Sequence, residues 1–333
     1  MRFVHFIVTF FTLLLFSLAA AGLYAVHYVN QDGPLLEDSL VDVEKGWGLN
    51  RLSAHLEAQN IIENAAVFKA AGYLHGKSME LRSGEYHVEA GSSILDLLNL
   101  FTEGQAFQRG FTVPEGATSY EIIQSLNQND ELRGEAILQI PEEGSLLPET
   151  YHFTKGDSRQ DIIARMQADL NAVLDSAWAS RQANLPLKSR QEALTLASII
   201  EKETGVKGER RRVAGVFINR LRIGMALQTD PTVIYAITKG KHQNNGRGPL
   251  GRRLLRKDLK IDSPYNTYRY PGLPPGPIAN AGKAAIEAAL NPEDHDYLYF
   301  VADGTGGHVF SKTLAEHNAN AAKWRIIRKQ QND

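Results

Sequence analysis

The chain has 333 residues and a formal net charge of −2 at pH 7, which allows two or three domains and gives no overall excess of cations for general nucleic-acid binding. It contains no cysteine, which excludes disulfides and thiolate chemistry. The charge is nevertheless uneven, with 21 acidic and 8 basic residues over 30–157 but 3 acidic and 14 basic residues over 207–260. The basic stretch could face an anionic partner or form an ordinary solvated surface.

The N-terminal segment predicts a membrane anchor. Residues 3–26 contain no Lys, Arg, Asp or Glu, and about 20 apolar residues are enough to cross a bilayer core. We therefore predict a cytoplasmic tip and transmembrane helix over residues 1–29, although Ala19-Ala20-Ala21 leaves open a signal-peptidase site. Arg2 and the amino group favour a cytoplasmic N-terminus, with the remaining chain outside the cytoplasm.

A short pattern then recurs three times. A valine, two further residues and a glycine precede an amphipathic stretch at Val43–Gly46, Val88–Gly91 and Val113–Gly116. Each copy predicts a strand, a glycine turn and a helix. Such units resemble LysM modules, which bind polymers of N-acetylglucosamine, but a packing unit without a ligand would show the same pattern. We assign residues 30–140 to a small LysM-like α/β subdomain.

A loop over 141–157 is predicted to join this subdomain to a mixed α+β domain over 141–333, so the predicted fold class is α+β throughout. Residues 265–277 hold six Pro or Gly residues, which excludes a regular helix or a central strand. The predicted elements of the second domain are helices over 157–174, 191–203, 213–222 and 279–290, a hairpin with strands at 297–302 and 308–311, and a polar helix from 314.

Glu203 is the strongest candidate for chemistry. It continues, at spacings of three and four, a stripe of apolar residues, Ala193, Leu196, Ile199 and Ile200. Glu201 lies about 160° away from Glu203 around the helix, so we expect only Glu203 to lie on the buried face. An apolar environment raises a carboxyl pKa and keeps the group able to donate a proton. A glutamate at a fraying helix end, paired with an arginine at 210–212, is the alternative.

Two polar clusters could line a sugar-binding cleft. Gln228, Thr229 and Asp230 form one, and Asp230 is the nearest candidate for a second carboxylate, although a plain turn would also explain the pattern. Asn266 and Tyr268 belong to a proline-rich stretch that could bind sugar or simply form a rigid surface loop. The histidines lack a credible metal-ligand spacing, so no metal is predicted.

Several strings together resemble the MltG (YceG-like) endolytic murein transglycosylases. They include A-S-I-I-E-K-E-T (197–204), V-F-I-N-R-L-R-I-G-M-A-L-Q-T-D-P-T (216–232), Y-N-T-Y (265–268) and G-L-P-P-G-P-I (272–278). The resemblance covers nearly the whole chain, apart from a longer basic insert around Lys239–Arg256. It implies an inner-membrane protein with one span and its bulk in the periplasm, no cofactor, and Glu203 as catalytic acid. Candidate substrate contacts are Thr204, which could also orient Glu203, together with Asn219, Gln228, Thr229, Asp230, Asn266 and Tyr268.

The resemblance implies cleavage of the β-1,4 bond between N-acetylmuramic acid and N-acetylglucosamine in nascent strands, which would leave 1,6-anhydromuramyl ends and terminate strand elongation. A lysozyme-like hydrolase that uses Glu203 with Asp230 remains an alternative. A non-catalytic, membrane-anchored glycan-binding scaffold of the wall-synthesis machinery is another. The expected partners are peptidoglycan strands, the membrane through residues 3–26 and, as a further candidate, peptidoglycan synthases; no nucleic acid is expected.

Overall fold

The computed structural model describes residues 2–77, 81–241 and 249–331, so residues 242–248 of the basic insert lie outside the described part. The chain divides into two compact units, one of 1–109 with 152–155 and one of 110–151 with 156–333. Residues 110–140, which the sequence analysis placed in the LysM-like subdomain, thus group with the second unit. The functional domain boundaries at 29 and 140 stay predictions.

The first unit begins with a long exposed helix, α1 (Arg2–Asn30). Its stretch His5–Asn30 has 26 residues and contains an 18-residue window with a mean hydropathy of 2.3, none of which is buried. Length and composition therefore suit a membrane span, although a signal sequence would meet the same criteria. An exposed apolar helix of this kind needs a non-aqueous environment around it.

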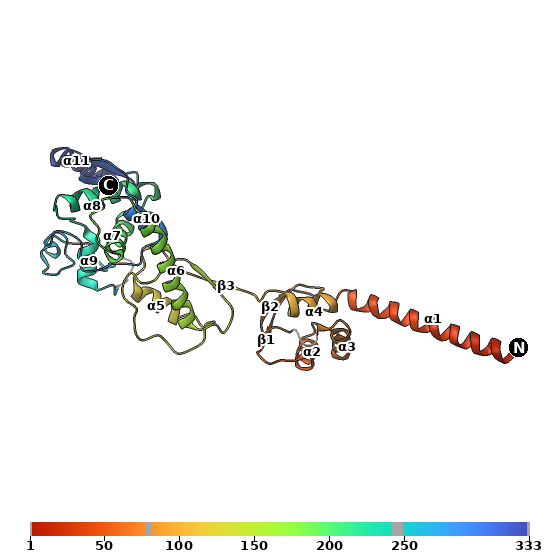
Figure 1. Cartoon of the computed structure of the whole chain (residues 1–333). Coiled ribbons are helices and arrows are strands. Elements are labelled where there is room, and N and C mark those ends of the chain that lie inside the picture. The colour runs from red at the N-terminus through yellow and green to blue at the C-terminus, as the bar shows by residue number, and fades with distance from the viewer. Residues whose placement is uncertain (1, 78–80, 242–248, 332–333) are drawn as a thin grey trace. The chain divides into compact units, whose positions relative to one another are not determined.

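The rest of this unit alternates strands and helices around a small core: β1 (Ser39–Val43), α2 (Leu49–Ala58), α3 (Ala65–Leu74), β2 (Gly84–Val88) and α4 (Ile94–Glu103) (Figure 1). Strands β1 and β2 pair antiparallel, with Val41 opposite Tyr86. Both side chains are buried, together with leucines and Phe101 from the helices. Ser93 closes a capping box with Asp96 at the start of α4, which fixes where this helix begins. The sequence analysis did not predict α3.

The three recurrent glycines all adopt the left-handed conformation that the predicted turns require. Gly46, Gly91 and Gly116 have φ angles of 88°, 73° and 78°, a region that glycine enters without steric cost. The third copy leads from β3 (Arg109–Thr112) into α5 (Ser119–Asn127). Strand β3 pairs with β4 (Thr150–Phe153), so the prediction of an uninterrupted loop over 141–157 was wrong for these four residues.

The second unit is built mainly from helices, and α7 lies at the centre of its core. This core joins α6 (Arg159–Ala179), α7 (Arg190–Glu203), α8 (Arg210–Arg222) and α10 (Lys283–Leu290) through buried aliphatic side chains. Helix α6 runs five residues beyond its predicted end, and α10 starts four residues after its predicted start. Residues 193–201 of α7 are all buried, so this helix forms the centre of the core.

The remaining elements complete a mixed α+β architecture, in agreement with the predicted class. They are α9 (Asp230–Thr238), the short 3-10 helices η2 (Lys207–Glu209) and η3 (Asp258–Lys260), β5 (Tyr299–Ala302), β6 (His308–Ser311) and α11 (Leu314–Gln331). Strands β5 and β6 form the predicted antiparallel hairpin. Residues 265–277 contain neither helix nor strand, as their proline and glycine content predicted.

Candidate active site

Glu203 is the last residue of α7 and carries a carboxyl group without a partner. Its side chain is half-buried, and it forms no hydrogen bond or ion pair with any of the described residues. Burial of the carboxyl group raises its pKa to about 7, and the nearby charge of Asp230 adds to the rise, whereas Arg220 opposes it. About half of the Glu203 side chains would then hold a proton at neutral pH, as a general acid requires.

Asp230 and Tyr268 form a hydrogen-bonded pair beside Glu203. The Tyr268 hydroxyl donates to Oδ1 of Asp230 over 2.6 Å. Burial and then this bond raise the pKa of Tyr268, so the phenol keeps its proton and its role as donor. Asp230 begins α9 and is exposed. The pair therefore places an accessible carboxylate where its charge favours the protonated form of Glu203.

Arg220 is a part of the site that the sequence analysis missed. It is 7% exposed, and its Nε and Nη1 donate to the carbonyl oxygens of Leu298 (2.7 Å) and Leu227 (2.6 Å). Burial lowers its pKa, and its charge acts on Glu203. Arg220 follows Phe217 by three residues on the apolar side of α8, a spacing that could have revealed its burial. It ties α8 to the irregular segment that precedes Gln228 and to the residue before β5.

The Gln228–Thr229 segment has an unusual backbone beside the two carboxyl groups. Gln228 is exposed with a φ angle of 51°, a conformation that non-glycine residues adopt rarely. Thr229 is buried, and its backbone N–H donates to the Thr267 hydroxyl over 3.0 Å. The Thr229 hydroxyl itself is buried, and no residue that the structure describes forms a hydrogen bond with it. Of the two, Gln228 is placed to reach a ligand directly.

Three of the predicted contact residues are occupied by bonds within the protein. The Thr204 hydroxyl donates to the carbonyl of Ile200 over 2.7 Å, so it bonds to its own helix rather than to Glu203. The Asn219 amide donates to the carbonyls of His295 and Tyr297.

Asn266 likewise serves the loop that carries Tyr268. It is fully buried, its amide donates to two backbone carbonyls, and its Oδ1 accepts from the N–H of Tyr268 over 3.1 Å. The structure therefore gives Asn266 an orienting role, and the expectation that it contacts substrate directly finds no free group on its side chain.

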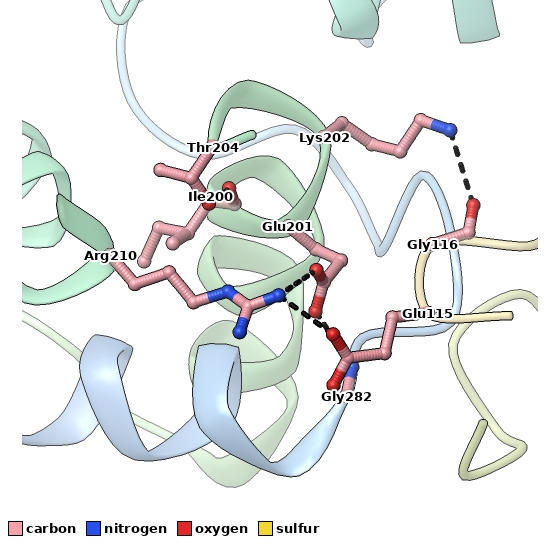
Figure 2. Close-up of polar contacts among 8 residues, drawn as sticks. All are labelled: Glu115, Gly116, Ile200, Glu201, Lys202, Thr204, Arg210 and Gly282. Atoms are coloured by element: carbon pink, nitrogen blue, oxygen red, sulfur yellow. Dashed lines mark hydrogen bonds and ion pairs between the residues drawn. The ribbon is translucent and has the colours of Figure 1, made fainter. Parts of the chain in front are cut away.

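Glu201 lies on the other side of α7 in a buried ionic cluster (Figure 2). Nη2 of Arg210 donates to Glu201 over 2.8 Å and to Glu115 over 2.7 Å, and the N–H of Gly282 donates to the second oxygen of Glu201 over 2.9 Å. Glu201 is 9% exposed. The expectation that only Glu203 lies on the buried face was therefore wrong, because α7 is surrounded by protein along most of its length.

The same cluster decides against the alternative in which an arginine at 210–212 neutralises Glu203. Arg210 is bound to Glu201 and Glu115, Arg211 donates to the carbonyl of Asn291, and Arg212 pairs with Glu293. All three guanidinium groups are thus engaged elsewhere. Within residues 2–77, 81–241 and 249–331, no group of three His, Asp or Glu side chains could hold a metal ion.

Comparisons with known proteins agree with one another. The profile of the YceG-like family matches residues 41–323. An endolytic murein transglycosylase of Bacillus subtilis (strain 168) is 37% identical over 317 residues, which cover 85% of this chain and 84% of the relative. An endolytic murein transglycosylase of Streptococcus pneumoniae serotype 2 is 28% identical over 94% of this chain and 64% of its own length. The crystal structure of a yceG-like protein from Listeria monocytogenes shares 32% identity at a TM-score of 0.50, covering 85% of this chain and 99% of that one.

Proposed function

The chain belongs to the YceG-like family, and we propose that it is an endolytic murein transglycosylase whose general acid is Glu203. The proposal is that it cleaves the β-1,4 bond between N-acetylmuramic acid and N-acetylglucosamine inside glycan strands and so ends their elongation. The observation that carries the assignment of Glu203 is its carboxyl group, which has no hydrogen-bond or ion-pair partner in the described part of the chain and whose pKa lies near 7 because of burial and of Asp230. An ordinary glutamate would be ionised at neutral pH and could not donate a proton.

The reaction needs one carboxyl group acting twice. Protonated Glu203 gives its proton to the glycosidic oxygen as the bond from the anomeric carbon breaks and an oxocarbenium-like centre develops. The resulting carboxylate takes the proton of the muramic 6-hydroxyl, whose oxygen bonds to the same anomeric carbon and closes the 1,6-anhydro ring. This nucleophile is intramolecular, so its effective concentration exceeds that of water. Glu203 ends the cycle protonated.

Asp230 supports this step through its charge. It adds to the rise in the Glu203 pKa that burial causes, and so increases the fraction of Glu203 that holds a proton at neutral pH. Tyr268 holds this carboxylate through the 2.6 Å hydrogen bond. We propose Gln228 as a contact for the glycan, since its side chain is exposed next to the pair. Thr229, which is buried beneath this surface, is proposed to support the segment.

The position of Asp230 also favours a second candidate, a muramidase in which Asp230 assists water or forms a covalent intermediate. The products separate the two reactions. Mass analysis of fragments released from purified murein should find 1,6-anhydromuramyl ends with the wild-type chain and no cleavage with Glu203→Gln. Reducing muramyl ends would indicate the hydrolase, and unchanged activity of Glu203→Gln would remove Glu203 from the mechanism altogether.

The cellular setting is part of the same proposal. Helix α1 is long and apolar enough to cross a membrane, and we propose a single-pass anchor in the bacterial inner membrane with the remaining chain in the periplasm, where murein lies. We further propose that the LysM-like residues 30–140 contact glycan and that peptidoglycan synthases are partners. Labelling of residues on either side of α1 in intact cells with a membrane-impermeant reagent tests the orientation.

A further inference from the structure

An apolar groove of about 320 Å³ lies between the end of α1 and helix α3. Helix α3 supplies Val67, Ala70, Ala71 and Leu74 to its walls, and α1 supplies residues between Tyr24 and Val29. Both helices belong to the first compact unit. His75 is the only ionisable lining residue apart from the tyrosines, so the groove suits a hydrocarbon ligand better than a sugar or a peptide backbone.

The mouth of the groove continues into an exposed apolar surface on α3. Leu74 is 86% exposed and Tyr73 is 62% exposed, and both occupy the last turn of this helix. Single exposed apolar residues are common on soluble proteins. Here Leu74 lines the apolar groove together with the exposed Tyr24 of α1, and Tyr73 is its neighbour in the same helical turn. Exposed apolar side chains that gather around a groove are of the kind that marks an interaction site.

The length of α1 places this surface at a definite depth. The 26 residues of His5–Asn30 extend about 39 Å as a helix, whereas the hydrocarbon core of a bilayer is about 30 Å thick. The last turns of α1 therefore reach the headgroup region. Tyr24 and Tyr28 lie in these turns, and tyrosine is enriched at this depth in membrane proteins. Residues packed beside Tyr24–Val29 lie at the same level.

We propose that α3 lies in the surface of the leaflet from which α1 emerges, with Tyr73 and Leu74 inserted and lipid acyl chains filling the α1–α3 groove. This inference rests on the membrane-anchor part of the proposed function and not on the assignment of Glu203. Lipid is the occupant that the structure favours, because one wall of the groove is the anchor helix itself. Lys69 is the one charged residue of α3, and its ammonium group can reach anionic headgroups.

This contact would give the first unit two attachments to the membrane. A single helix followed by a short linker leaves a domain free to rotate above the bilayer, whereas an inserted second helix fixes its orientation. The buried face of α3, with Phe68, Ala71 and Gly72, packs into the core of the unit. The orientation of α3 in the leaflet would thus be passed to the whole unit.

The absence of cysteine from the chain makes a site-directed labelling test possible without background. Nitroxide labels are placed at Leu74→Cys on α3, at Leu15→Cys inside α1 and at Lys45→Cys in the exposed turn after β1. The full chain is reconstituted in vesicles of phosphatidylethanolamine and phosphatidylglycerol. Collisions with oxygen, which concentrates in lipid, are compared with collisions with a water-soluble nickel chelate.

The label at position 74 should collide with nickel about tenfold less often than the label at position 45, as an interfacial helix does. A label at Ala70→Cys should become more accessible to nickel when Tyr73→Ser and Leu74→Ser are introduced together. If the label at position 74 collides with nickel as often as the label at position 45, while the label at position 15 stays in lipid, the proposed insertion of α3 is wrong and the membrane anchor α1 is supported. That result would also be found if the surface served a protein partner instead. If position 15 is in water as well, both the anchor and the contact fall.

Discussion

Two carboxyl groups lie two residues apart at the end of α7, and their surroundings differ in partners more than in burial. Glu201 is 9% exposed and is bound by Arg210 and by the N–H of Gly282. Glu203 is less completely covered and has no bonded partner among the described residues. The partners of Glu201 compensate its buried negative charge, whereas Glu203 lies near the like charge of Asp230.

The comparison shows why burial alone does not identify a catalytic acid. Desolvation raises the pKa of Glu203, whereas the carboxylate of Glu201 forms an ion pair with Arg210 and accepts from the backbone N–H of Gly282. A carboxyl group becomes a proton donor at neutral pH when such partners are missing. We therefore treat Glu201 as part of the framework that holds α7 and Glu203 as the reactive group, and the following changes test this division.

The largest effect should come from Glu203→Gln. The amide has a similar shape but no acidic proton, so the rate of murein cleavage should fall by about 10²- to 10⁴-fold, the range typical for the loss of a general acid. Release of labelled fragments from murein under single-turnover conditions measures this rate. Glu192→Gln makes the same chemical change in the first turn of the same helix, where the Glu192 side chain is partly exposed, and should leave the rate unchanged. A loss below tenfold for Glu203→Gln would contradict the assignment.

Glu201→Leu should act on stability instead. It leaves the buried N–H of Gly282 without an acceptor and Arg210 with Glu115 alone, and removal of one member of a buried pair costs about 3 kcal/mol or more. Urea unfolding of the detergent-solubilised chain, followed by intrinsic fluorescence, measures the change. Glu201→Gln should cost less, because its amide oxygen can still accept from Gly282. Equal stability of wild type and Glu201→Leu would show that the cluster is not structural.

The sequence predicted most of the fold because its signals were local. Apolar periodicity located α6, α7, α8, α10 and the β5–β6 hairpin to within five residues, whereas α9 was not predicted. Strand β4 was missed, because Thr150–Phe153 is too short to show a pattern and becomes a strand only through pairing with β3. Helix α3 was also missed, because its mainly apolar sequence has no polar face that would reveal a helical period.

The site was predicted in part. Helical spacing pointed to Glu203, and the resemblance of the strings 197–204 and 216–232 supported it. Helical spacing failed for Glu201, because the argument assumes that only one face of the helix is buried. Helix α7 is covered by protein on several sides, so Glu201 is buried as well. The structural roles of Asn219 and Asn266 follow from backbone carbonyls that lie far away in the sequence or in irregular loops, and no spacing rule records such contacts.

The pH dependence of stability should distinguish Glu203 from an ordinary surface carboxylate. Its pKa is about 7 in the folded chain against 4.5 as the ordinary value, so the folded state binds the proton more tightly. The contribution of protonated Glu203 is fully present below pH 4.5 and is lost as the pH rises through 7. Glu203→Gln has no such loss and should gain about 2–3 kcal/mol relative to wild type between pH 4.5 and 8. Unfolding free energies at both pH values give the difference, and Glu192→Gln should show none.

The smallest effect should come from Asp230→Asn, and it separates the two candidate reactions. The amide keeps an oxygen that can accept from Tyr268 but removes the negative charge that helps to raise the pKa of Glu203. The alkaline limb of the pH–rate profile should therefore move to lower pH, with a loss of about two- to fivefold at pH 7 and little change at pH 5. Loss by two orders of magnitude at pH 5 would instead mean that Asp230 acts directly on the sugar or on water, as the muramidase mechanism requires.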